Sequence, residues 1–256
     1  MTTQSHHDHV EKQFSSQASE YLTSTVHASG RDLQRLAVRL ADYPDASVLD
    51  MGCGAGHASF VAAQNVSTVV AYDLPAHMLD DVAQAAEARQ LKNITTRQGY
   101  VESLPFADNA FDIVISRYSA HHWHDVGAAL REVNRILKLG GKLIVMDVMS
   151  PGHPVRDIWL QTVEALRDIS HTRNYASGEW LTLISEANLI VDNLITDKLP
   201  LEFSSWVARM RTPEALVDAI RIYQQSASTE VKTYFALQND GSFTSDIIML
   251  EAHKAA

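Results

Sequence analysis

The stretch VLDMGCGAG, residues 48–56, decides the fold that this sequence predicts. Apolar residues lead into Asp50, and Gly52, Gly54 and Gly56 then alternate with small or flexible residues. Glycine permits a positive φ and a close approach of the backbone to a ligand. The stretch is therefore typical of a buried parallel strand that ends in a tight, ligand-binding turn.

A second strand is expected over residues 68–72, and an acidic residue, Asp73, follows it 17 positions after Gly56. In nucleoside-binding α/β folds, an acid in this place accepts hydrogen bonds from the ribose hydroxyls. The alternative interpretation is that Asp73 caps a helix that begins near Pro75. The spacing between Asp73 and the glycines favours the ribose interpretation.

The turn argues against two common nucleotide sites. A dinucleotide fingerprint read from Gly52 requires a glycine where His57 stands, so an NAD-dependent oxidoreductase is not expected. A phosphate-binding P-loop requires a lysine, which the turn lacks. An acid before the glycines repels a pyrophosphate but suits a cationic amino-acid group. The pattern D-x-G-x-G-x-G with Asp73 resembles that of the class I S-adenosylmethionine (SAM) methyltransferases, specifically the branch of the ubiquinone and menaquinone C-methyltransferases.

The resemblance covers roughly residues 45–150 and extends to QGYVESLPF (98–106), AHHWHD (120–125) and the segment 130–141. Tyr100 departs from it, because many relatives carry there an aspartate that binds the adenine amino group. Backbone groups around Val101, or Glu102, are expected to replace that contact. Leu139 stands where many relatives have proline, without consequence for the fold.

The resemblance implies SAM as the cofactor and assigns a part of it to each segment of the site. For Met78, ordinary core packing is the alternative. The expected cofactor residues are Asp50, Gly52, Gly54 and Gly56 around the methionine part, Asp73 on the ribose, Met78, Tyr100 and Val101 at the adenine, and Ser116 and Arg117 near the sulfonium.

Two histidines, His121 and His122, follow the strand expected over 111–116, at the sheet edge where an acceptor would lie. They are the candidate catalytic residues, because a general base is needed where the acceptor must lose a proton. A structural hydrogen-bonding role is the alternative for either one. No metal is expected: metal-dependent catechol methylation needs an acid and an Asp-Asn pair where Ser116-Arg117 and Asp147-Val148 stand.

Arginine and aromatic residues gather after residue 165 and suggest contacts with the methyl acceptor. Arginine beside aromatic rings suits a carboxylate, phosphate or enolate, although a salt-bridged surface is the alternative. An N-terminal helix with Phe14 and Tyr21 is expected, by resemblance, to close over the cofactor. The candidate substrate residues are Tyr21, His171, Arg173 and Trp206.

Strands alternate with helices, which predicts a parallel sheet covered on both faces. The fold class is α/β, a Rossmann-like seven-stranded sheet with helices on both faces and a small helical cap; by resemblance, the last two strands form a hairpin and the final one is antiparallel. The expected organisation is a helical lid over 1–44, a SAM-binding core over 45–150, and a completion of the sheet with an inserted substrate cap over 151–256. Strands are expected at 46–51, 68–72, 93–98, 111–116, 142–147, 189–198 and 243–251, and helices within 11–42 and at 76–90, 126–137 (ended by Gly140-Gly141), 154–169, 178–187 and 213–225.

The composition and net charge of the chain limit the classes of partner that are expected. The chain has 256 residues, 46% of them apolar and 20% charged, which is ordinary for a soluble globular protein. A formal net charge of −10 argues against a nucleic-acid substrate. No signal peptide or membrane span is evident, so a cytoplasmic location is expected. The single cysteine, Cys53, reads as a small turn residue, and His6, His7 and His9 as a solvated tail.

The function that these patterns predict is SAM-dependent methyl transfer to a carbon or oxygen atom of a small organic molecule. The resemblance slightly favours carbon. A non-catalytic SAM- or SAH-binding protein with a sensing or partner role is the alternative, suggested by the missing adenine acid at Tyr100. The acceptor and the oligomeric state stay open.

Overall fold

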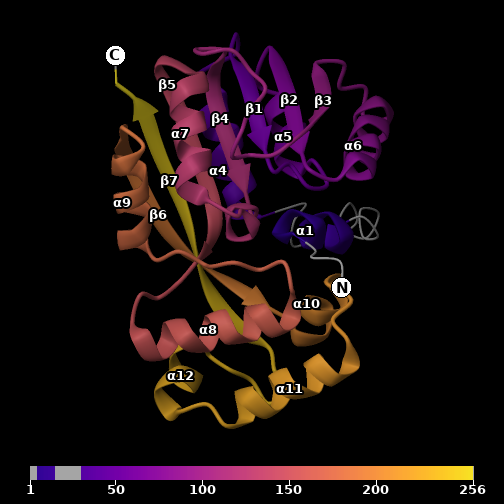
Figure 1. Ribbon diagram of the computed structural model, residues 1–256, viewed down its shortest axis with the longest axis vertical. Helices are drawn as coiled ribbons and strands as arrows, with labels where there is room; N and C mark the ends of the chain where they lie inside the picture. The colour runs from indigo at the N-terminus through magenta and orange to yellow at the C-terminus, as the bar shows by residue number, and fades with distance from the viewer. Residues whose placement is uncertain (1–4, 15–29, 256) are drawn as a thin grey trace.

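The computed structural model describes residues 5–14 and 30–255. Seven strands form one mixed sheet in the order β3-β2-β1-β4-β5-β7-β6, in which the first five strands along the chain are parallel and β7 is antiparallel to both of its neighbours. The predicted Rossmann-like fold and antiparallel final strand are confirmed (Figure 1). The strands are β1 (Ser47–Met51), β2 (Thr68–Asp73), β3 (Ile94–Gln98), β4 (Phe111–Arg117), β5 (Leu137–Met149), β6 (Leu189–Leu201) and β7 (Phe243–Lys254).

Helices cover both faces of the sheet because its strands are apolar on both sides. Adjacent residues of β1 show this: Val48 packs with the cluster under α4 and α5, whereas Leu49 packs with the cluster under α7 and α9. Such burial on both faces is the usual condition of a parallel sheet. The helices are α1 (His6–Phe14), α4 (Arg31–Leu40), α5 (His57–Ala63), α6 (Ala76–Ala88), the 3-10 turn η1 (Ala120–His122), α7 (Val126–Ile136), α8 (Pro154–Arg167), α9 (Ser177–Glu186), α10 (Phe203–Arg209), α11 (Glu214–Gln225) and α12 (Thr229–Tyr234).

The boundary between α7 and β5 differs from the sequence prediction. The prediction that Gly140-Gly141 ends the helix is wrong, because α7 ends at Ile136 and Leu137 already pairs with Phe111 as the first residue of β5. Leu137 is fully buried in the core. Burial of this side chain therefore draws the backbone into the sheet before the glycines are reached.

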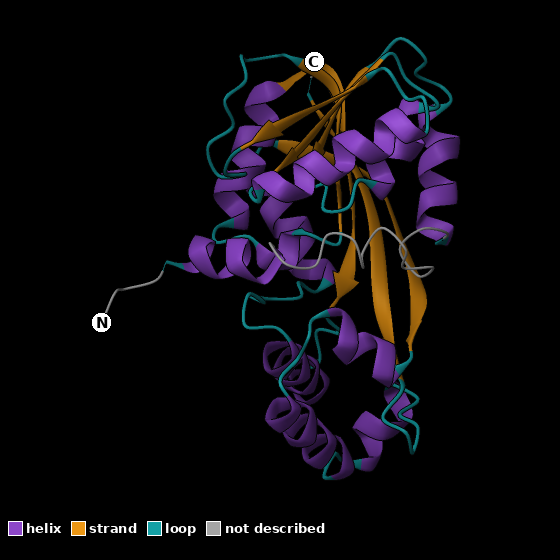
Figure 2. Ribbon diagram, turned by 90° about the vertical axis from the view of Figure 1, so that its right-hand side faces the viewer, coloured by secondary structure: helices purple, strands orange, loops and turns teal. Residues whose placement is uncertain are grey.

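A helical cap lies beyond the end of the sheet and is carried by the antiparallel pair β6 and β7. Figure 2 shows β6 and β7 running from the sheet down to the helices α8, α10, α11 and α12, two of which, α10 and α12, the sequence did not predict. The cap has its own apolar cluster, which includes Trp159, Phe203, Trp206, Phe235 and Phe243. Helix α1 lies between the cap and the parallel part of the sheet (Figure 1).

Truncating the centre of the cap cluster is expected to destabilise the protein strongly. Trp159 is only 2% exposed and its ring lies 4.4 Å from that of Phe235. Trp159→Ala should lower the free energy of unfolding by about 3–5 kcal/mol, as measured by urea denaturation. Ile158→Ala on the same helix is the control, because Ile158 is 60% exposed, and its loss should be small. Equal losses for the two variants would contradict this account of the cap.

Candidate active site

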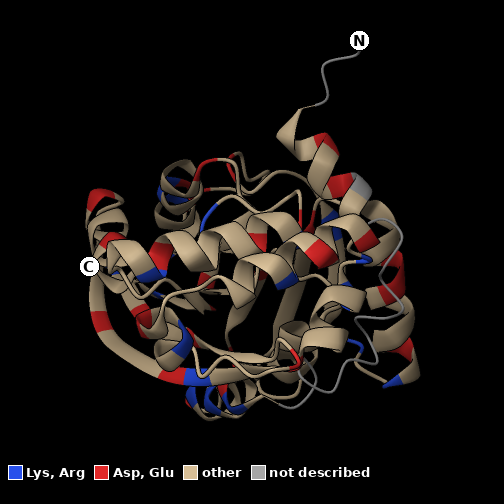
Figure 3. Ribbon diagram, turned by 90° about the horizontal axis from the view of Figure 1, so that it is seen from below, with Lys and Arg blue, Asp and Glu red and all other residues tan. Residues whose placement is uncertain are grey.

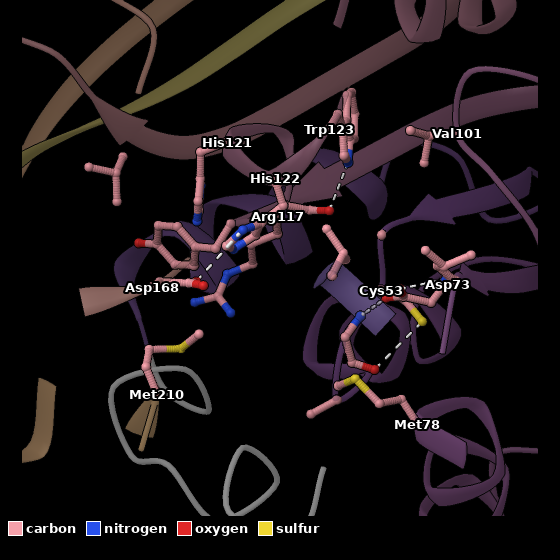
Figure 4. Close-up of a pocket in the computed structure, with 18 of the residues that line it drawn as sticks. Cys53, Asp73, Met78, Val101, Arg117, His121, His122, Trp123, Asp168 and Met210 are labelled. Atoms are coloured by element: carbon pink, nitrogen blue, oxygen red, sulfur yellow. Dashed lines mark hydrogen bonds and ion pairs between the residues drawn. The ribbon is translucent and has the colours of Figure 1, made fainter. Parts of the chain in front are cut away.

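A cavity lies at the carboxyl ends of the parallel strands, between the sheet and the cap. Figure 4 shows Cys53, Asp73 and Met78 on one side of it and His121, Asp168 and Met210 on the other. The loops after β1 and β4, the ends of β2 and β6, and helices α1, α8 and α10 all contribute to its wall. The sequence-predicted residues that line it are Gly52, Gly54, Asp73, Met78, Tyr100, Val101, Arg117, His121, His122 and Trp206.

The glycine turn after β1 is held by backbone hydrogen bonds to β2. The amides of Gly52 and Cys53 both donate to the carbonyl of Tyr72, at 2.8 and 3.1 Å. Gly52 has a φ of +72°, and a Cβ on it would lie 1.8 Å from the hydroxyl of Ser119. Only glycine satisfies both conditions, so the turn packs directly against the loop that follows β4.

Asp73 connects the end of β2 to this turn. Its carboxylate accepts hydrogen bonds from the amide of Gly54 at 2.6 Å and from the amide of Leu74 at 2.7 Å. Burial raises the pKa of Asp73 above its ordinary value, and the two amide bonds oppose that shift. Helix α6 begins after Pro75 without a side-chain cap, so the alternative role of Asp73 as a helix cap is not what the structure shows.

The space beside the turn suits a cofactor with a flat ring and hydroxyl groups. A Cβ on Gly54 would meet only the terminal methyl of Met78, at 4.0 Å, so the backbone there borders open space. Asp73 also lines the cavity, and its carboxylate oxygens keep further lone pairs for hydroxyl donors. Val101 lies on the same side (Figure 4). An accepting carboxylate beside open space and apolar side chains fits a nucleoside such as that of SAM.

Tyr100 and Glu102 close this side of the cavity together with α1. The ring of Tyr100, which is half exposed, lies 4.6 Å from that of His7. Glu102 accepts from the backbone amide of His124 at 3.0 Å and lies 3.5 Å from the His7 ring nitrogen. Helix α1 therefore covers the region of Tyr100 and Glu102, where the sequence analysis expected the adenine contact.

Three predicted cofactor residues lie outside the cavity wall. Asp50 is 1% exposed beneath the turn, where it accepts a hydrogen bond from the hydroxyl of Ser59. Gly56 is the N-cap of α5 with a φ of +79°, and Ser116 is buried within β4. Burial raises the pKa of Asp50 to about 7. Within the described part of the chain, the other carboxylate oxygen of Asp50 has no hydrogen-bond partner.

The chain leaves β4 through a strained residue. Tyr118 has a φ of +49°, a left-handed conformation that is costly for a residue with a side chain and is concentrated at functional sites. Its amide donates to the carbonyl of Met146 at 2.8 Å. Arg117, the residue before it, is buried and ion-paired with Asp32 of α4. These contacts fix the start of the loop that carries the two histidines.

The two histidines have different partners. Nδ1 of His121 lies 2.6 Å from a carboxylate oxygen of Asp147, at the end of β5. Nδ1 of His122 lies 3.3 Å from the carbonyl of Ser170 and 3.8 Å from a carboxylate oxygen of Asp168. The sequence analysis did not assign Asp147 to the site. The sequence does contain one signal for Asp147, because an acidic residue near the carboxyl end of a parallel strand lies at the edge of the sheet where ligands bind.

The predicted substrate residues separate in the structure. Trp206 lines the cavity, and Arg167 lies over its ring at 4.9 Å while forming an ion pair with Glu164. His171 lies behind the wall, with its ring nitrogen 3.0 Å from the side-chain oxygen of Gln161. Arg173 pairs with Glu179 and Asp157 and is likewise not part of the wall. Tyr21 lies outside the described residues.

An apolar part of the wall was missed by sequence reasoning. It comes from the ends of β5 and β6 and from the segment after α10, whose proximity depends on the cap. In the sequence these positions look like ordinary core residues, so no local signal marked them. They are Val148, Leu199, Leu201 and Met210.

Comparisons with known proteins give a consistent family. The family model of a methyltransferase domain matches residues 49–145. The uncharacterised protein YafE of Escherichia coli is 90% identical over 205 residues, covering 80% of this chain and 99% of that protein. The uncharacterised methyltransferase YcgJ of Bacillus subtilis is 34% identical over 227 residues, covering 89% and 90%, respectively.

Two further comparisons concern the solved fold and a relative with a named activity. The crystal structure of Bacillus subtilis YcgJ superposes with a TM-score of 0.84 at 32% identity, covering 88% of this chain and 99% of that one. A demethylmenaquinone methyltransferase of Lactococcus lactis is 28% identical over 169 residues, covering 63% of this chain and 66% of that protein.

The buried Asp50 generates a pH-dependent prediction. Its pKa is about 7 in the folded protein against an ordinary 3.8, so between these values the folded state holds a proton that the unfolded state has lost. The free energy of unfolding of the wild type therefore loses this contribution as pH rises through that range. Asp50→Asn lacks this titration, so its stability relative to the wild type should rise from pH 4 to about pH 7 and then level off.

Thermal denaturation across this pH range measures the effect. Asp42→Asn is the control, because Asp42 is exposed and its variant should follow the wild type at every pH. If the difference in stability between Asp50→Asn and the wild type stays constant with pH, the assignment of Asp50 as a buried acid with a raised pKa is contradicted.

Proposed function

The chain belongs to the class I SAM-dependent methyltransferases, and we propose that it transfers a methyl group from SAM to a small organic molecule. The observation that carries the proposal is that one cavity joins the glycine turn and Asp73 to His121 and His122. A proposed cofactor side and a proposed acceptor side thus meet in one cavity (Figure 4).

We infer that the cofactor side holds SAM through the backbone of Gly52 and Gly54 at the methionine part and through Asp73 at the ribose. Met78, Tyr100 and Val101 would border the adenine ring. Arg117 would lie near the sulfonium, whereas Asp50, Gly56 and Ser116 would support the turn and strand from beneath. The geometry of the turn and its bond to Asp73 support this assignment.

On the acceptor side, the wall combines an apolar surface with charges that are already paired. Arg167 is bonded to Glu164, and Arg117 to Asp32. An anionic acceptor would have to compete with these buried carboxylates, and breaking a buried pair is costly. This favours an acceptor with an apolar body over the carboxylate or phosphate that the arginines suggested in the sequence.

SAM supplies a methyl group that its sulfonium has already activated for displacement. The task of the protein is then to align the acceptor atom with that methyl group and to exclude water, which contributes several kcal/mol to catalysis. Trp206 and the apolar wall would orient the acceptor, and His121 or His122 would take a proton where the acceptor carries one. Transfer to carbon or to oxygen fits this arrangement, and the similarity to quinone methyltransferases favours carbon.

A small-molecule acceptor fits the charge of the chain better than a nucleic acid does. The net charge is −10, and acidic and basic residues are distributed around the molecule (Figure 3). Nucleic-acid binding calls for a basic stripe or patch. No helix in residues 5–14 and 30–255 has the length and apolar composition to cross a membrane.

The cofactor assignment predicts that Asp73→Ala weakens SAM and SAH binding by about 10-fold or more. The reason is that a hydrogen bond to a charged group contributes about 1.5–3 kcal/mol. Isothermal titration calorimetry on the full chain measures it. Asp80→Asn, an exposed acid on α6, is the control and should bind like the wild type. Unchanged affinity in Asp73→Ala would overturn the cofactor site.

Turnover is the second test of the proposed function. SAH release should be detected with at least one member of a panel of phenols, enols, hydroxy acids and amines, and should fall on substitution of His121 by Gln. SAM binding without turnover on any member would instead indicate a binding protein without catalytic activity.

A further inference from the structure

Within residues 5–14 and 30–255, a ring nitrogen of His121 lies in hydrogen-bond contact with a buried carboxylate. The distance from Nδ1 of His121 to Asp147 is 2.6 Å. A carboxylate only accepts hydrogen bonds, so Nδ1 carries a proton and, in the neutral ring, Nε2 keeps its lone pair. In this arrangement a carboxylate orients an imidazole and stabilises its charged form. The same relation between aspartate and histidine is found in general-base catalysis.

Both members of this pair are rigidly held. Asp147 lies in β5, between β4 and β7, is 2% exposed and also accepts the backbone amide of Val148 at 2.8 Å. The carbonyl of His121 accepts two hydrogen bonds from Thr172, one from its amide and one from its hydroxyl, both at 2.8 Å. Therefore neither the carboxylate of Asp147 nor the backbone of His121 can move without breaking hydrogen bonds at the edge of the sheet.

His122 has a different environment. Its Nδ1 lies 3.2 Å from the hydroxyl oxygen of Ser170 and 3.3 Å from the carbonyl oxygen of the same residue, and a carboxylate oxygen of Asp168 lies 3.8 Å away. Asp168 in turn accepts bonds from the amide and the hydroxyl of Ser170 through its other oxygen. The ring of His121 lies 4.2 Å from that of His122, so a proton on one imidazole repels a proton on the other.

The charged and titratable groups around His121 come from every element packed against it. They are Asp147 on β5, Glu164 on α8, Asp168 directly after it, His122 on η1 and His171 in the following loop. Burial lowers the pKa of His121, but the charge and the hydrogen bond of Asp147 outweigh it, so that the pKa is raised overall.

The pKa values of the two neighbouring histidines, His122 and His171, are lowered instead. Burial and the proximity of His121 lower the pKa of His122 to about 4. Burial, with the same neighbouring rings, lowers the pKa of His171 to about 2. Both of these rings therefore stay neutral near neutral pH, whereas the pKa of His121 is shifted in the opposite direction, upward, by Asp147.

We propose that Asp147 is a positioning residue that makes His121, and not His122, the proton acceptor of the site. The inference rests on the proposed methyl transfer and deepens it. The acceptor's proton passes to Nε2 of His121, and the electron pair of the broken bond forms the new bond to the methyl group. The electron pair of the methyl–sulfur bond remains on sulfur as a neutral thioether. The resulting imidazolium is stabilised by Asp147.

The titration of His121 tests this assignment without knowledge of the acceptor. NMR of the full chain labelled at histidine follows each imidazole with pH, and the His121 signal is assigned by its loss in His121→Gln. Asp147→Asn keeps the shape of the side chain but removes its charge. It should shift the His121 titration to lower pH by about one unit or more, whereas Asp147→Glu should restore part of the shift.

The chain provides a matched control in a second histidine–aspartate pair. Nδ1 of His253 lies 2.8 Å from Asp192, on β7 and β6 away from the cavity. Asp192→Asn removes a carboxylate from that pair and should leave the titration of His121 in place. A His121 titration that is unchanged in Asp147→Asn, or a His122 signal that titrates near neutral pH in the wild type, would overturn the proposal.

Calorimetry with SAM separates this inference from the proposed function. Asp147→Asn should bind SAM like the wild type, because Asp147 acts on the histidine. With an acceptor found in the turnover panel, the acid limb of the pH–rate profile should move to lower pH in Asp147→Asn. Normal SAM binding with an unshifted His121 would overturn only the base assignment. A shifted His121 in a protein that binds no SAM would overturn the methyl transfer instead.

Discussion

Parallel pairing of the first five strands aligns their carboxyl ends along one edge of the sheet, and the candidate site depends on that constraint. The glycine turn follows β1, Asp73 ends β2, His121 follows β4 and Asp147 lies near the end of β5. These residues are far apart in the chain, yet each occupies the same position relative to its own strand. Ligands bind at this edge in open α/β sheets for the same reason.

The antiparallel strands β6 and β7 connect the parallel part of the sheet to the helical cap. They extend past the sheet and carry the cap, whose aromatic cluster makes it a packed unit. Residues of β6, Leu199 and Leu201, then reach the cavity, as does Trp206 of α10. The cap side thus adds an apolar part to the proposed acceptor side, whereas the two histidines and the proposed cofactor side belong to the edge of the parallel sheet. Cap variation can change acceptor preference without changing the cofactor site.

Some sequence predictions were accurate because their signals are local. The glycine pattern and its spacing to Asp73 require a particular backbone path, and the structure joins Gly54 to Asp73 directly. Asp50 has the same acidic character, but its side chain points beneath the turn to Ser59. In a strand buried on both faces the apolar pattern does not reveal which face a residue occupies, so sequence alone did not separate these two acids. The helix end at Gly140 was misplaced for a related reason, because burial of Leu137 outweighed the local glycine signal.

By itself, the sequence determined the α/β class, the position of the cofactor turn, the acid after the second strand and the histidine pair after the fourth, because each depends on short-range pattern and strand order. Only the tertiary structure decided which residues meet. It placed Asp147 on His121 and left His122 against Ser170. In the tertiary structure, Arg173 and His171 lie outside the cavity wall, whereas Leu199 and Met210 are part of it. Such contacts join segments that are distant in sequence, and they are set by side-chain packing across the sheet edge and the cap, which no local pattern encodes.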